Sequence, residues 1–105
     1  MGKKKNNFRK GFRKNTRIKH PTYLVDKDGN FYKYIGVTHS KTYQGVDNVP
    51  LRKNPNPNDT AKAYIRPIVE KDSPQNFGRT LKGWKFSSED KKTVDKIIKK
   101  SKSDK

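Results

Sequence analysis

The 105-residue sequence contains no cysteine and far fewer acidic than basic side chains. Without cysteine, neither disulfide bonds nor thiolate chemistry is possible. No apolar run is long enough to span a membrane, and the basic N-terminus is not followed by the apolar stretch of a signal peptide. These absences make a cytoplasmic protein with no membrane partner the default expectation.

The sequence is also poor in residues that hold metals and phosphates. Two histidines without cysteine cannot build a usual zinc site, and the ten acidic residues include no carboxylate pair at helical spacing. The seven glycines stand apart as turn or hinge residues and form no Gly-rich phosphate loop. We therefore expect neither a metal nor a cofactor.

What the chain has in excess is positive charge. It carries 27 Lys and Arg against 10 Asp and Glu, a formal net charge of +17. Residues 1–19 hold many of these cations and no acid, with Phe8, Phe12 and Ile18 as their larger apolar side chains. This pattern predicts a disordered basic arm over residues 1–19, one small domain over residues 20–100, and a disordered tail over residues 101–105.

The arm interleaves aromatic and cationic side chains in a pattern typical of nucleic-acid binding. Phe-Arg-Lys occurs at residues 8–10 and again at 12–14. Cations of this kind pair with phosphates, and phenylalanine rings stack on unpaired bases. The expected nucleic-acid-binding residues are basic or aromatic side chains of the arm and of later strands and loops: Lys3, Lys4, Lys5, Phe8, Arg9, Lys10, Phe12, Arg13, Lys14, Arg17, Lys19, Lys33, Arg52, Lys53 and Arg66.

The positive charge of the arm also fits three roles that do not involve nucleic acid. The arm has the composition of a solvated tail that aids solubility. A membrane surface would attract the charge, although the spacing has no clean amphipathic stripe. An acidic protein partner would attract it too, as for a small inhibitor from a phage or mobile element.

Residues 20–40 are the part of the chain richest in strand-forming residues on both sides of a turn. Residues 23–25 enter, residues 26–30 contain the Asp, Gly and Asn of a tight reversal, and residues 31–38 return. The returning strand is apolar on both faces, with Phe31, Ile35 and Val37 on one and Tyr32 and Tyr34 on the other. A strand of this kind is usually covered on both sides, as in a small closed barrel.

The following segments predict further short strands. Residues 46–51 and 61–70 are strand candidates, and Pro67 limits the second to an edge or a bulge because proline cannot donate to a ladder. The Asn-Pro loop at residues 52–59 is expected to be stiff, with Asx turns. Residues 77–86 are expected to bend and to pack Trp84 and Phe86 on the core.

One helix is expected near the C-terminus. Ser87 and Asp90 form a start similar to a capping box, and Val94, Ile97 and Ile98 make one narrow apolar stripe. The helix should cover residues 88–100. The predicted fold class is therefore α+β: a small, mostly antiparallel, SH3-like β-barrel with a C-terminal helix and a disordered basic N-terminal arm.

One corner of the hairpin holds the groups that metal-free RNA cleavage needs. His20 precedes the first strand, and Thr38, His39 and Ser40 follow the second, so neighbouring strand ends bring them close together. Such cleavage requires a group that accepts the 2′-OH proton, a group that protonates the leaving oxygen, and a cation on the phosphate, here Arg52 or Arg66. A histidine at strand entry and an ordinary Thr-His-Ser loop account for the same residues without catalysis.

The residues around this corner also resemble a known family. His-Pro-Thr-Tyr-Leu-Val at 20–25, a turn, and Tyr-Ile-Gly-Val-Thr-His-Ser at 34–40 are similar to the opening of the PemK/MazF-like toxins. The resemblance implies a small SH3-like barrel that dimerises and cleaves RNA without metal, using the residue before the proline and the Thr or Ser after the second strand. His20 stands where that family has arginine, and the basic arm replaces the family's opening strand.

From the sequence we predict a nucleic-acid-binding protein, with RNA as the expected ligand. The alternatives are a PemK/MazF-like metal-independent endoribonuclease and a small inhibitor protein. The sequence leaves open whether the protein is an enzyme, and it defines neither base preference nor oligomeric state.

Overall fold

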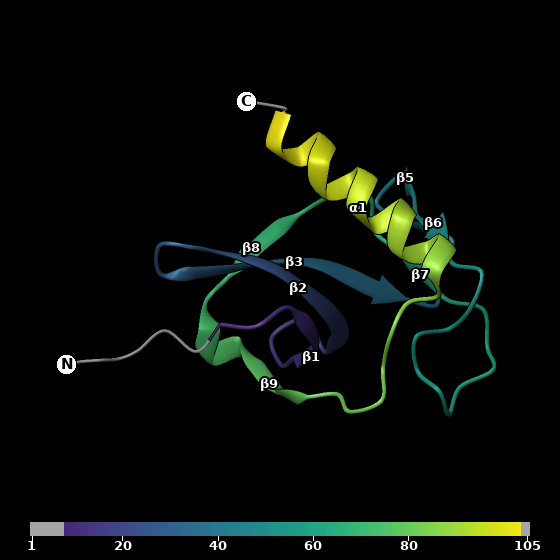
Figure 1. Ribbon diagram of the computed structural model, residues 1–105, viewed down its shortest axis with the longest axis horizontal. Coiled ribbons are helices and arrows are strands. Elements are labelled where there is room, and N and C mark those ends of the chain that lie inside the picture. The colour runs from purple at the N-terminus through teal and green to yellow at the C-terminus, as the bar shows by residue number, and fades with distance from the viewer. Residues whose placement is uncertain (1–7, 104–105) are drawn as a thin grey trace.

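A long antiparallel hairpin forms the centre of the computed structural model, which describes residues 8–103 (Figure 1). β2 (His20–Asp28) pairs with β3 (Phe31–Thr38), and Gly29 takes the positive φ of 58° that the tight reversal requires. The register shifts between Leu24 and Asp26, so the hairpin contains a bulge. The predicted hairpin is confirmed.

Short strands extend this hairpin on both sides into a seven-stranded sheet of order β6-β7-β3-β2-β1-β9, with β8 also paired to β3. The added strands are β1 (Gly11–Asn15), β6 (Val49–Pro50), β7 (Tyr64–Ile65), β8 (Glu70–Asp72) and β9 (Phe77–Thr80). A separate two-stranded sheet joins β4 (Thr42–Tyr43) to β5 (Val46–Asp47), and a 3₁₀ turn, η1 (Pro74–Asn76), leads into β9. The strand predicted over residues 61–70 therefore divides into β7 and β8, with Pro67 between them.

The sheet is open in the described part of the chain. β6 and β9 are its two ends, and no ladder between residues 8 and 103 joins them. The fold is thus α+β and mostly antiparallel, as predicted, but the expected closed barrel is not formed. A barrel closes only when its first and last strands pair, and here the end strands β6 and β9, of two and four residues, do not pair with each other.

The prediction of a disordered arm over residues 1–19 is wrong for Gly11–Asn15. These residues form β1, which pairs with β2 on one side and β9 on the other. Phe12 is 4% exposed and packs in the core, so one buried ring outweighs the charge around it. Residues 1–7, which include Lys3, Lys4 and Lys5, and residues 104–105 lie outside the described residues.

Apolar clusters cover both faces of the central hairpin, as the returning strand predicted. One cluster contains Ile35 and Val37 of β3 together with Val94 of the helix. The other contains Leu24, Tyr34 and Phe77. Phe31 does not join the first cluster and is 45% exposed, because it lies at the tip of the hairpin beside the turn.

Aromatic rings close the first cluster at one edge. The ring centroid of Phe12 lies 4.8 Å from that of Phe86 and 5.7 Å from that of Trp84, and the Tyr23 centroid lies 4.9 Å from that of Phe86. Trp84 is therefore a packing residue, as expected. Packing of β1 against residues 84–86 explains why this irregular segment keeps its place beside the sheet.

The helix α1 (Ser88–Ser103) packs its apolar stripe on the first cluster (Figure 1). The Ser87 hydroxyl accepts a hydrogen bond from the Asp90 backbone N–H at 3.1 Å, which confirms the predicted N-cap. The helix continues past residue 100, contrary to the predicted tail, because no Gly or Pro stops it and Lys100 and Lys102 favour its C-terminal end. Between residues 8 and 103 no helix is long and apolar enough to cross a membrane.

The Asn-Pro loop is held by the Asx turns that its sequence predicted. The side-chain oxygens of Asn54, Asn56 and Asp59 each accept a hydrogen bond from a backbone N–H two residues later, at 2.9 Å. The buried carboxylate of Asp90 accepts the backbone N–H groups of Arg52 and Lys53 at 2.9 and 3.1 Å. These bonds tie the loop to the first turn of α1.

Candidate functional site

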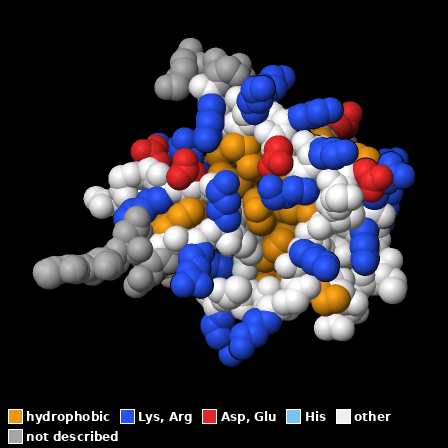
Figure 2. Space-filling model, viewed as in Figure 1, with side chains coloured by type: hydrophobic (Ala, Val, Ile, Leu, Met, Phe, Trp, Pro, Cys, Tyr) orange, Lys and Arg blue, Asp and Glu red, His pale blue; other side chains and the backbone are white. Residues whose placement is uncertain are grey.

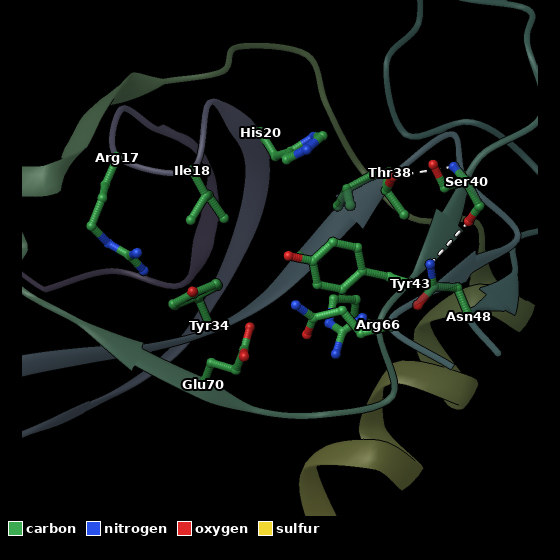
Figure 3. Close-up of a pocket in the computed structure, with 13 residues that line it drawn as sticks. Arg17, Ile18, His20, Tyr34, Thr38, Ser40, Tyr43, Asn48, Arg66 and Glu70 are labelled. Carbon is green, nitrogen blue, oxygen red and sulfur yellow. Dashed lines mark hydrogen bonds between the residues drawn. The ribbon is translucent and has the colours of Figure 1, made fainter. Parts of the chain in front are cut away.

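A large cavity lies where β3, the β4–β5 hairpin and the β1–β2 turn meet (Figure 3). Its volume is about 560 Å³, which lies within the usual range for small-molecule sites. Three of the four predicted corner residues, His20, Thr38 and Ser40, line it. The hairpin geometry therefore brings these residues to one place, as the sequence predicted.

His39 does not line this cavity. Its Nε2 lies 2.9 Å from Oδ2 of Asp59, and it lines a smaller pocket of about 40 Å³ that His20 and Thr38 also line. Hydrogen bonds from the Ala61 N–H and from His39 lower the pKa of Asp59. His39 therefore lies beside His20 and Thr38 in the smaller pocket, but it does not line the cavity that they share with Ser40.

Two predicted cations, Arg17 and Arg66, lie at opposite sides of the cavity (Figure 3). Arg17 donates from Nε to Asp72 Oδ2 at 2.8 Å and remains half exposed. The Arg66 guanidinium lies over the Tyr43 ring, with Cζ 4.8 Å from its centroid. A cation on an aromatic face is weakly stabilised and keeps its hydrogen-bonding edge available for another partner.

A buried polar network fixes the position of Arg17. Asp72 accepts hydrogen bonds from Asn15 Nδ2 at 3.0 Å, Asn76 Nδ2 at 2.8 Å and the Ser73 N–H at 2.7 Å, besides that from Arg17. Burial raises the pKa of Asp72, but these hydrogen bonds more than offset it and hold the pKa at about 2. The hydrogen bond to Asp72 and the charge of its carboxylate raise the pKa of Arg17.

Asn15 shapes the turn that carries Arg17 into the cavity wall. Its Oδ1 accepts the backbone N–H groups of Arg17 and Ile18 at 2.9 and 3.0 Å. Asn15 is fully buried, and Lys19 at the end of the turn adopts a positive φ of 61°. The turn between β1 and β2 is therefore a defined structure, although its sequence is part of the predicted arm.

Several residues of the cavity were not predicted from the sequence. Tyr34 and Glu70 form the wall between the two arginines, while Tyr43, Gln44 and Asn48 come from the β4–β5 hairpin and its flank. Burial, followed by the nearby Glu70 carboxylate, raises the pKa of Tyr34, so its phenol stays protonated at neutral pH. Only the polar character of residues 40–48 could have pointed to this segment.

The other predicted nucleic-acid-binding residues divide into exposed cations and packed side chains. Phe12 is buried in the core, Phe8 packs on Tyr32 at 5.2 Å, and Arg13 Nε donates to the Gly78 carbonyl at 2.7 Å. The expectation that Phe12 stacks on bases is therefore wrong. Exposed cations that remain accessible are Arg9, Lys10, Lys14, Lys19, Arg52 and Lys53, whereas Lys33 is half-buried.

Positive side chains are common on the face of the molecule that carries α1 (Figure 1). Figure 2 shows Lys and Arg spread over one face, with few Asp and Glu among them and an apolar strip between them. In that part of the chain which the structure describes, no three His, Cys, Asp or Glu side chains are close enough together to hold a metal ion.

Comparison with protein families, curated proteins and solved structures finds no match to this chain. The resemblance of residues 20–40 to the PemK/MazF-like toxins stays a prediction.

Proposed function

We propose that this protein binds single-stranded RNA, with its cationic surface on the phosphates and its main cavity holding an unpaired nucleotide. The observation that carries the proposal is the cavity of about 560 Å³ that joins Arg17, Arg66 and His20 in a chain of net charge +17. Charge of this sign and size attracts phosphates from any nucleic acid. A cytoplasmic location, expected from the sequence, agrees with this role.

The shape of the site favours a single strand over a duplex. A cavity of this volume admits one flexible nucleotide, whereas the bases of a duplex are stacked and paired and cannot enter it. Its walls combine donors, such as the Tyr34 phenol and Arg66, with an acceptor in Glu70. Sequence-tolerant single-strand binders combine cationic grooves with aromatic rings in a comparable way.

Fluorescence polarisation with labelled single-stranded RNA, duplex RNA and duplex DNA, in EDTA and over a range of salt concentrations, tests this proposal. We expect the single strand to bind tightest, with log K falling against log salt at a slope of about −3.5 if about five phosphates are neutralised. Polyglutamate, which offers negative charge without nucleotides, should compete poorly. Equal affinity for every polyanion would contradict the proposal.

A pair of matched variants locates the binding. Arg66→Ala removes a cation of the cavity, and Arg79→Ala removes an exposed cation of β9 that does not line it. We expect Arg66→Ala to weaken single-strand binding about tenfold, because a charge-assisted contact of about 1.4 kcal/mol is lost. Arg79→Ala should change it by about twofold at most. Equal effects would place binding on the general surface.

One observation favours a second candidate, metal-independent RNA cleavage. His20, Thr38 and Ser40 line the same cavity as Arg66. In that reaction an imidazole accepts the 2′-OH proton, the 2′-oxygen attacks phosphorus, the 5′-oxygen leaves with a proton, and the guanidinium stabilises the added charge. The resemblance to the PemK/MazF-like toxins, with the SH3-like barrel that it implies, would agree with this second function. Products ending in a 2′,3′-cyclic phosphate would support it, and intact RNA after saturation would exclude it.

A further inference from the structure

Two polar atoms of the cavity residues are buried without a hydrogen-bond partner. They are Nη1 of Arg66 and Oδ1 of Asn48, and they are the buried side-chain atoms of this kind found between residues 8 and 103. Both residues line the main cavity. Buried polar groups in folded proteins nearly always have partners, so an unpaired donor and an unpaired acceptor at one site point to an external partner.

The orientation of Asn48 is fixed by its other bonds. Its side-chain Nδ2 donates to the Ser40 carbonyl at 2.9 Å, a bond drawn in Figure 3, and its backbone N–H donates to the Lys41 carbonyl at 2.8 Å. Rotating the amide by a half turn would break the first of these bonds. Oδ1 is therefore held as an acceptor on the opposite side of the amide, and Asn48 is only 6% exposed.

Arg66 is held in a comparable way. Its backbone N–H donates to the Gly36 carbonyl at 3.1 Å, and its guanidinium rests on the Tyr43 ring. Within the described part of the chain, no carboxylate lies within 4 Å of its nitrogens as an ion-pair partner. Among the described residues, the Arg66 guanidinium thus contacts an aromatic ring but has no carboxylate partner.

The identity of the missing partner follows from what the two atoms require together. A phosphate offers hydrogen-bond acceptors only, so it would pair with Arg66 but leave the Asn48 oxygen without a donor. The negative charge of Glu70, which lines the same cavity, would also repel it. A nucleobase edge carries an acceptor beside an N–H donor and has a flat face that stacks on tyrosine. We propose that the end of the cavity formed by Tyr43, Asn48 and Arg66 is a nucleobase site, while phosphates are bound outside it.

The β4–β5 hairpin covers this end of the cavity and controls access to it. It forms its own two-stranded sheet, unpaired with the large sheet, and it turns at Gln44 and Gly45, which have φ values of 51° and 77°. Tyr43 on this hairpin is 53% exposed, an unusual degree for an aromatic ring beside a cavity. Because the two unpaired atoms are buried, binding of a base requires the hairpin to shift and expose Arg66 and Asn48, after which the base stacks on Tyr43.

This inference rests on the proposed RNA binding, and the test separates the two. The affinity of the full chain is measured by fluorescence polarisation for an eight-nucleotide RNA and for the same sugar–phosphate strand without bases. We expect the RNA to bind at least about tenfold tighter, the usual effect of one stacked base. Tyr43→Ala and Arg66→Lys should reduce this ratio to about twofold, whereas Tyr43→Phe, which keeps the ring, should preserve it.

Circular dichroism is used to check that each variant is folded. Because Tyr43 is exposed, removing its side chain should not unfold the protein. Arg66→Lys keeps the charge, so a phosphate anchor would survive that substitution while a base-reading guanidinium would not. Equal wild-type affinity for the two strands, or an undiminished ratio in Tyr43→Ala, would overturn the base site and leave RNA binding in place. Failure of both strands to bind would overturn the proposed function together with this inference.

Discussion

Replacing Asp72 with asparagine removes the charge from the network that holds the β1–β2 turn against the cavity. The carboxylate accepts four hydrogen bonds, from Asn15, Arg17, Ser73 and Asn76. An asparagine offers one oxygen in place of two, so its amide nitrogen must face one of these donors. The substitution therefore loses both the charge and part of the hydrogen bonding.

The pKa of Asp72 sets the size of the effect. It is about 2 in the folded protein against an ordinary value of 3.8. A carboxyl whose folded pKa is depressed stabilises the protein above its unfolded pKa and loses that contribution as pH falls through the folded pKa. The difference corresponds to about 2 kcal/mol, fully present above about pH 5 and lost between about pH 4 and pH 2.

Urea unfolding of the wild type and Asp72→Asn between pH 7 and pH 2 measures this contribution. The variant should be about 2 kcal/mol less stable at pH 7, and the two proteins should converge towards pH 2. Asp28→Asn is the matched control, because Asp28 pairs with Lys71 at 3.4 Å on the exposed surface and should contribute less than about 1 kcal/mol. A difference between wild type and Asp72→Asn that stays constant with pH would show that the charge of Asp72 does not stabilise the fold.

Further substitutions test the core, the loop anchor and the second candidate function. Val94→Ala should lower the unfolding free energy by about 2 kcal/mol in urea, because the Val94 side chain of α1 is fully buried against the sheet. Asp90→Ala leaves the N–H groups of Arg52 and Lys53 without their acceptor and should cost about 2 kcal/mol by the same assay. If the protein cleaves RNA, His20→Ala should slow the metal-free reaction about a hundredfold with little change in binding, and an unchanged rate would remove His20 from catalysis.

The elements that could be predicted from the sequence are those whose signals are local. The turn between β2 and β3 is specified by the Asp, Gly and Asn beside it, and the helix by the Ser87 cap and the stripe that contains Val94. The Asx turns of residues 52–59 are local as well. In each case the residues that determine the structure lie within a few positions of one another.

The parts of the fold that were predicted wrongly depend on contacts between residues far apart in the sequence. Phe12 is one apolar residue among cations, and only its contacts with Tyr23, Trp84 and Phe86 make β1 part of the sheet. Barrel closure likewise depends on pairing between the first and last strands, which hydrophobic patterning does not report.

The site divides in the same way. His20, Thr38 and Ser40 were predicted to meet because one hairpin joins them. Tyr43 and Asn48 reach the cavity from the β4–β5 hairpin and its flank, and no hydrophobic periodicity in the sequence predicts this hairpin. Their role follows from burial and contacts that exist only in the folded chain. A search for charge alone finds Arg66 but not its missing partner.

Titration of the ¹⁵N-labelled protein with single-stranded RNA, followed by backbone amide shifts, is the most direct test of the proposed RNA site. We expect the largest shifts on the cavity segments, at Gly36, Ser40, Gln44 and Asn48, and we expect them to saturate together with the polarisation signal. Lys96, on the exposed face of α1, should shift far less. Shifts spread evenly over the cationic surface, with none concentrated at the cavity, would contradict it.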